Sequence, residues 1–147
     1  MNWNANDMDT YLQQKEYIDT ILVPLLKLDT NPENMKSSSS SAEFLMHLST
    51  FIETQFKGRI MLLPPFTYTQ STELEVFAET LQNDIELMGF KHAFYLTTDS
   101  KWTSSKLEDV IWLPSIPLES MDKQLRQKII EDQLRQVLPL LTQKWTE

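Results

Sequence analysis

The side chains that could do chemistry gather in two short stretches, "PFTYTQS" and "TTDSKWTSS". Each stretch follows an apolar run, and together they carry hydroxyl, carboxylate, ammonium and indole groups. Groups of these kinds can hold a polar small molecule through hydrogen bonds and charge. The alternative is that the serine, threonine and aspartate residues only cap helices and turns. The candidate binding residues are Thr67, Tyr68, Thr98, Asp99, Lys101 and Trp102.

The composition argues against several familiar kinds of active site. The chain has no cysteine, so it can form no disulfide and offers no thiolate as nucleophile or zinc ligand. It has only two glycines, Gly58 and Gly89, whereas phosphate-cradling loops need several. His47 and His92 are far apart and lack the spacing of metal ligands. We therefore predict no catalytic residues, no metal site and no cofactor.

The charge of the chain points away from nucleic acids. The formal net charge is −8, and binding to nucleic acid depends on neutralising phosphates with basic residues. Glu75, Glu79 and Glu86 recur along one predicted helix face. This face is either an ordinary solvated surface or a docking surface for a basic protein partner.

Length and hydropathy indicate one soluble domain. A chain of 147 residues fits a single domain. The first 17 residues are polar, unlike a secretory signal, and no apolar run approaches the roughly 20 residues of a membrane span. We expect a cytoplasmic protein that does not contact membranes. The run "KSSSSS" predicts a flexible loop over residues 30–40.

Apolar patterning supplies the elements that must position the candidate residues. Four runs are rich in apolar residues, and one of them, "RIMLLP", does not alternate with polar residues, as in a strand that is covered on both faces. Between them, apolar residues recur at helical spacing. The capping pairs Ser40/Glu43 and Thr72/Glu75 should begin two helices. Strands are predicted at 18–28, 59–64, 92–98 and 109–114, and helices at 7–17, 40–57, 72–88 and from 120 onward.

Two prolines complicate this pattern. Pro24 lies inside the first apolar run and cannot donate a hydrogen bond, so that strand should end near Val23 or lie at a sheet edge. Pro139 should kink or divide the last helix.

The alternation of strands and helices predicts an α/β fold. We expect a three-layer sandwich with a mainly parallel sheet of about four strands in a Rossmann-like or flavodoxin-like topology. The fourth strand is predicted to be parallel if residues 99–108 include a helical turn, and antiparallel if they form a long hairpin loop. In open parallel sheets ligands bind beyond the carboxyl ends of the strands, where both candidate stretches would lie.

Several segments resemble the YpiF-like family of Gram-positive bacterial proteins. They are Trp3, the Lys15–Thr20 segment, Pro24 and the Trp112–Pro114 turn. The resemblance covers nearly the whole chain and implies a small cytoplasmic bacterial protein of a family with no established activity. It supplies no catalytic residue.

Two classes of function follow. The first is a non-enzymatic binding or accessory protein that contacts a protein partner, or forms a homodimer, through its acidic surface or last helix. The second is a domain that binds or converts a small molecule at the strand ends. The lack of cysteine, glycine loops and a histidine constellation favours the first class.

Overall fold

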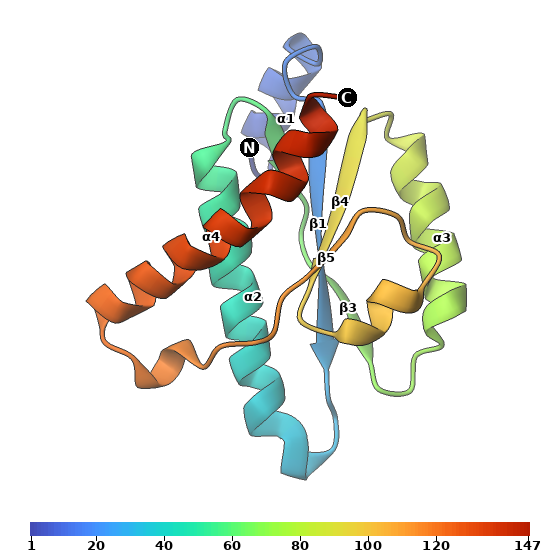
Figure 1. The fold of residues 1–147 in the computed structure, drawn as a ribbon. Helices are drawn as coiled ribbons and strands as arrows, with labels where there is room; N and C mark the ends of the chain where they lie inside the picture. The colour runs from blue at the N-terminus through green and yellow to red at the C-terminus, as the bar shows by residue number, and fades with distance from the viewer.

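The computed structural model describes residues 1–147 and shows an α/β fold of three layers, as predicted (Figure 1). None of the helices combines the length and the hydropathy that a membrane crossing requires. The helices are α1 (Ala5–Gln13), α2 (Met35–Gln55), α3 (Leu74–Leu87) and α4 (Lys123–Trp145), with 3₁₀ helices η1 (Pro32–Asn34), η2 (Ser100–Ser104) and η3 (Leu118–Ser120). The strands are β1 (Thr20–Leu28), β2 (Ile60–Leu62), β3 (Phe66–Thr69), β4 (His92–Thr97) and β5 (Val110–Trp112).

The sheet is parallel throughout. Its order is β2-β1-β4-β5, and β3 continues along β1 beyond β2. Since β2 and β3 occupy the same edge, four strand positions result, in the order expected for a flavodoxin-like sheet. Strand β5 runs parallel to β4, and η2 supplies the helical turn between them.

A separate hydrophobic core lies on each face of the sheet. Successive side chains of a strand point to opposite faces, so Leu22 of β1 packs with α2 and α4. Its neighbour Ile21 packs with α3 on the other face. A smaller cluster joins α1 to the sheet through Tyr11, Ile18 and Met61. Uninterrupted apolar runs therefore mark strands that are covered on both sides, as the sequence pattern predicted.

The prediction for Pro24 was wrong, because β1 is central and continues to Leu28. The backbone N–H of Thr20 donates to the carbonyl of Arg59, and the carbonyl of Leu22 accepts from the N–H of Leu63. The backbone groups of every second residue of β1 therefore face β2 and β3. Pro24 belongs to this set. The pairing jumps from Leu22↔Leu62 to Leu25↔Phe66, so the missing N–H falls at the break between β2 and β3.

The predicted flexible loop over residues 30–40 is also wrong, because the segment contains η1 and the first turns of α2. The helix begins at Met35, and Ser40 lies inside it and donates a hydrogen bond to Glu119. Contacts of Ser38 account for the ordered start of α2. Its hydroxyl accepts from the backbone N–H of Asp29 and donates to the carbonyl of Lys27, which fastens the helix to the end of β1.

The predicted starts of two helices also need correction. Thr72 does not cap α3, because its hydroxyl accepts a hydrogen bond from the N–H of Thr69 and the helix begins at Leu74. Asp122 caps α4 by accepting from the N–H of Leu125. Pro139 does not divide this helix, which runs to Trp145 as one element.

Candidate functional site

Three of the candidate residues meet where β3 and β4 end. The hydroxyl of Tyr68 donates to Asp99 Oδ2 over 2.7 Å. The indole Nε1 of Trp102 donates to the same hydroxyl oxygen over 2.8 Å. Both rings are buried, and they meet edge to face with centroids 5.1 Å apart. The chain of hydrogen bonds fastens η2 against β3.

The electrostatics of this group indicate a structural role for Tyr68. Burial, and next the hydrogen bond to Asp99, raise the pKa of the Tyr68 hydroxyl well above its usual range. The phenol therefore stays protonated and acts as a donor to the carboxylate. A donor held in this way serves neither as a general base nor as a nucleophile at neutral pH.

Other candidate residues lie apart from this group. Thr67 belongs to β3 rather than to a loop, and it is exposed. The Lys101 side chain is also exposed, and its residue contributes only a backbone N–H to Asp99 Oδ1, at 3.1 Å. Thr98 and Asp99 do line a cavity, together with residues that sequence reasoning had not selected.

That cavity, which we call the strand-end cavity, has a volume of about 240 Å³. It lies between the ends of β1 and β4. The chain leaves β1 toward one edge of the sheet and leaves β4 toward the other edge. Ligands usually bind at such a switch point in open α/β sheets. No hydrophobic side chain lines it. The signal that was missed is the serine run, of which Ser37, Ser38 and Ser41 line the cavity once α2 begins at Met35. Its lining residues are Lys27, Asp29, Ser37, Ser38, Ser41, Thr98 and Asp99.

Most polar groups of the strand-end cavity already have partners within the chain. Asp99 accepts from Tyr68 and from the N–H of Lys101. Asp29 accepts from the N–H of Asn31 over 3.0 Å, and the Ser38 hydroxyl both donates and accepts. Satisfied groups of this kind stabilise the ends of strands and the start of a helix.

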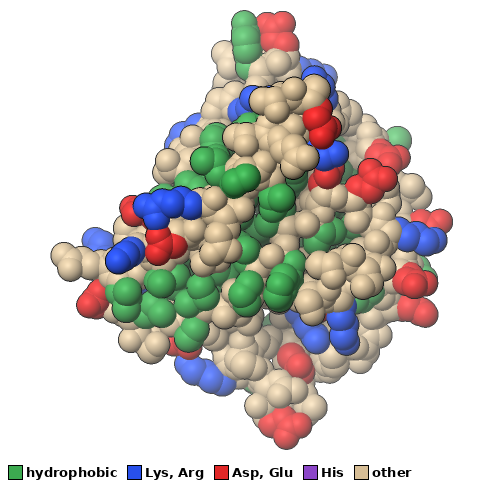
Figure 2. All heavy atoms as spheres, in the orientation of Figure 1, with side chains coloured by type: hydrophobic (Ala, Val, Ile, Leu, Met, Phe, Trp, Pro, Cys, Tyr) green, Lys and Arg blue, Asp and Glu red, His purple; other side chains and the backbone are tan.

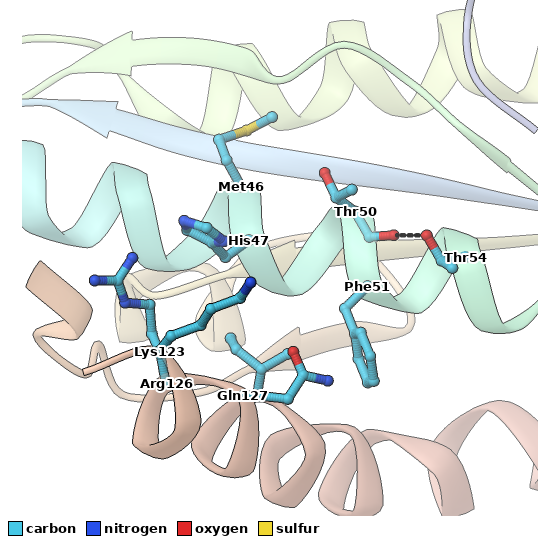
Figure 3. A pocket seen from close by; sticks show the side chains of 9 residues that line it. Met46, His47, Thr50, Phe51, Thr54, Lys123, Arg126 and Gln127 are labelled. Carbon is cyan, nitrogen blue, oxygen red and sulfur yellow. Dashed lines mark hydrogen bonds between the residues drawn. The ribbon is translucent and has the colours of Figure 1, made fainter. Parts of the chain in front are cut away.

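A larger cavity, of about 660 Å³, lies between α2 and α4, and we call it the α2–α4 groove. Figure 3 shows Lys123 and Arg126 of α4 pointing toward α2, while Phe51 of α2 points toward α4. The helical spacing of Phe51 and His47 on α2 places both side chains on the side that meets α4. The lining residues are Met46, His47, Thr50, Phe51, Thr54, Lys123, Arg126, Gln127 and Ile130.

The α2–α4 groove is basic, although the protein is acidic. It contains Lys123, Arg126 and the titratable His47, and none of its lining residues is a carboxylate. The Nε of Arg126 is buried without a hydrogen-bond partner, whereas its Nη2 donates to the carbonyl of Met121 over 3.1 Å. Buried polar atoms nearly always have partners, so this N–H is an unsatisfied donor that is closed to solvent.

The surface near α4 also exposes apolar side chains. Figure 2 shows hydrophobic groups gathered around the start of α4 and the segment that leads into it. Leu125, Leu138 and Leu140 of α4 are exposed. Val137 and Leu141 of the same helix are fully buried.

The acidic face of α3 is solvated. Glu75, Glu79 and Glu86 are exposed, and none of them forms an ion pair. This arrangement is what an outer helix face requires, because exposed carboxylates keep their hydration.

Comparison with known proteins gives a family but no activity. The family model described as "Protein of unknown function (DUF2487)" matches residues 9–145. The chain is 35% identical to "Uncharacterized protein YpiF" of Bacillus subtilis (strain 168) over 147 residues, which are 99% of each chain. These matches confirm the resemblance seen in the sequence. No solved structure matches the chain.

Proposed function

We propose that this chain, which belongs to the DUF2487 family of proteins of unknown function, is a non-enzymatic binding protein of the bacterial cytoplasm. Its docking site is the α2–α4 groove, and its partner is a protein segment that carries both acidic and apolar side chains. The presence of Lys123 and Arg126 in a groove that no carboxylate lines is the observation that carries the proposal.

Charge and shape support an acidic occupant. Lys123 and Arg126 form a cationic rim, while Phe51 and Ile130 supply an apolar floor. An amphipathic helix or extended segment fits a groove between two helices by placing apolar anchors on the floor. Carboxylates of the same segment would meet the rim and pair with its cations. Complementary charge of this kind selects the partner and speeds association.

The strand-end cavity supports a small-molecule function less well. Its volume of about 240 Å³ is below the range of roughly 300–1,000 Å³ in which ligand pockets usually fall. Its acidic and hydroxyl groups mostly have partners already, so a ligand would have to displace them. The α2–α4 groove offers unpaired cations and more room.

A peptide titration tests the proposal. The probes are a designed amphipathic peptide with Glu between apolar anchors, a version with Lys in place of each Glu, and a scrambled acidic version. Fluorescence anisotropy should detect the first peptide only, and the affinity should fall as salt rises. Equal binding of the acidic and basic peptides would contradict the proposal.

A matched pair of variants assigns the binding to the groove. We expect Lys123→Glu combined with Arg126→Gln to raise the Kd of the acidic peptide about tenfold, because both cations are lost. A glutamate at the first position of α4 interacts favourably with the helix dipole, so the variant should still fold. Lys128→Glu combined with Arg135→Gln changes exposed α4 residues that do not line the groove. Equal losses in both variants would reject the groove.

The natural occupant is found by placing a photo-reactive side chain at Gln127, on the groove wall. The cross-linked peptide should be rich in both carboxylates and apolar residues. Sedimentation at rising concentration tests whether a second copy fills the groove instead. A dimer that Lys123→Glu with Arg126→Gln abolishes would overturn the proposal of a foreign partner.

A second candidate function is binding of a small polar molecule in the strand-end cavity, favoured by its place at the crossover switch between β1 and β4. An NMR titration with polyols, amino acids and sugar phosphates tests it. Shift changes should centre on Asp29, Ser41 and Thr98. Changes confined to other regions would reject this function.

A further inference from the structure

A separate cavity, of about 420 Å³, opens at the amino ends of β4 and β5. It lies between the last turns of α3 and α4, at the opposite end of the sheet from the strand-end cavity. In Figure 1 this is the region where β4 begins, beside the end of α4. We call it the amino-end cavity, and neither the α2–α4 groove nor the strand-end cavity shares a residue with it.

Tyr95 is the unusual member of this cavity. Its side chain is buried, with 3% of the residue exposed, and it lines the cavity. Its hydroxyl makes no hydrogen bond within the chain, whereas the hydroxyl of Tyr68 makes two. Although the residue is buried, its hydroxyl oxygen opens into the cavity and is free for a partner that the cavity can admit.

The charges around Tyr95 define the ligand. Glu86 and Asp109 lie close enough to act on its hydroxyl, and together with burial, which is the largest effect, they raise its pKa to about 12. The phenol is thus neutral and contributes a dipole rather than a charge. Glu86 and Glu108 line the cavity and have no ion-pair partner, whereas Asp109 is paired with Lys144 at 3.4 Å. The lining carries four carboxylates against two ammonium groups, those of Lys91 and Lys144, so its excess of negative charge attracts a cation.

Part of the remaining wall is apolar. Ile85, Phe90 and Ala93 line the cavity, so one end of the ligand would meet hydrocarbon rather than water. No group of three or more carboxylate or imidazole side chains comes close enough to hold a metal ion. A hydrated metal cation would also gain nothing from the apolar wall. An ammonium group attached to a short apolar body satisfies the carboxylates, the hydroxyl and this wall together.

We propose that the amino-end cavity binds a small organic amine. Its ammonium group lies beside Glu86 and donates a hydrogen bond to the hydroxyl oxygen of Tyr95, and its apolar part rests against Ile85 and Phe90. The site is independent of the docking groove, so either proposal can fail without the other.

The test uses phenethylamine and 1,5-diaminopentane as probes, with 2-phenylethanol and 1-pentanol as neutral counterparts. Binding is measured by NMR shift titration of the full chain. Both amines should bind with shift changes centred on Ile85, Tyr95 and Asp109, and the alcohols should bind at least about tenfold more weakly. Alcohols that bind as well as the amines, or amines that shift none of these residues at millimolar concentration, would overturn the proposal.

Two variants identify the contacts. Tyr95→Phe removes only the unpaired hydroxyl, so the fold should be kept while the Kd for each amine rises about fivefold. Glu86→Gln should raise the Kd by a similar factor. Glu79→Gln, an exposed change on the same helix outside the cavity, should leave the Kd unchanged. Unchanged binding in Tyr95→Phe, or equal losses in both glutamate variants, would overturn the site.

Discussion

The indole Nε1 of Trp145 donates a hydrogen bond to the hydroxyl of Thr20 over 2.7 Å, joining the last turn of α4 to the first residue of β1. The ring also meets Phe56 edge to face, with centroids 5.2 Å apart. The guanidinium of Arg59 lies over its face, 4.1 Å from the centroid. An indole that hydrogen-bonds and packs in this way anchors a helix end.

Trp145→Phe should therefore destabilise the protein. The phenyl ring keeps part of the packing but loses the hydrogen bond to Thr20 and weakens the contact with Arg59. We expect a loss of about 1 kcal/mol in the free energy of unfolding, measured with urea. Trp112→Phe is the matched control, because Trp112 is 41% exposed and should change stability by less than about 0.5 kcal/mol. Equal losses would contradict the anchoring role.

The ion pair beneath this anchor predicts a pH dependence. Arg59 Nε lies 3.0 Å from Asp19 Oδ1, and its Nη2 lies 3.1 Å from Oδ2. Burial alone would raise the pKa of Asp19, but hydrogen bonds from Arg59 and Thr20 outweigh it and lower the pKa below its usual 3.8. The stabilisation from a lowered pKa is complete above the unfolded-state pKa and is lost as the pH falls through the folded-state pKa.

Asp19→Asn tests this dependence. At pH 7 the wild type should be more stable than the variant, and the difference should shrink as the pH falls through the lowered pKa of Asp19. Urea unfolding at pH 7, 5 and 3 measures it. Asp9→Asn removes an exposed carboxylate without an ion pair and should give no such trend. A wild-type advantage that grows at low pH would contradict the assignment.

Tyr68 and Tyr95, which are both buried, should respond differently to loss of the hydroxyl. Tyr68→Phe leaves the buried Nε1 of Trp102 without an acceptor, which should destabilise the protein by about 1–3 kcal/mol. Tyr95→Phe removes a hydroxyl that has no partner in the chain, so stability should stay the same or rise slightly. Thermal unfolding of both variants compares them directly. A larger loss for Tyr95→Phe would show that its hydroxyl has a partner in the folded protein.

The sequence was sufficient for the layers of the fold but not for its sites. Apolar runs and helical stripes predicted the parallel sheet, because burial on both faces leaves a direct mark on composition. They did not predict β3, since Pro64 and Pro65 interrupt the run before it. They located Asp99 at the strand ends. They could not reveal the α2–α4 groove, because that depends on how Phe51 and Arg126, distant in sequence, face each other across two packed helices.

Pro24 offers a test of the register in the central strand. Its missing N–H falls at the break between β2 and β3, so Pro24→Ala should change stability by less than about 1 kcal/mol. Val23 and Leu25 alternate with it and face β4, whose pairing is unbroken. Val23→Pro should therefore cost about 3 kcal/mol or more, or prevent folding. Circular dichroism and urea unfolding measure both. A tolerated proline at position 23 would refute the register.

The serine run supplies the last prediction, because its members differ in what their hydroxyls contact. Ser38 joins α2 to the backbone of Asp29 and Lys27, whereas the Ser39 hydroxyl donates only to Lys36 of its own helix. Ser38→Ala should cost about 1–2 kcal/mol, since it leaves a half-buried N–H without its partner. Ser39→Ala should be neutral or stabilising by up to about 0.5 kcal/mol, because alanine has the higher helix propensity. Hydrogen exchange should show faster exchange at Asp29 in the first variant only. If both variants behave alike, the helix does not depend on this contact for its ordered start.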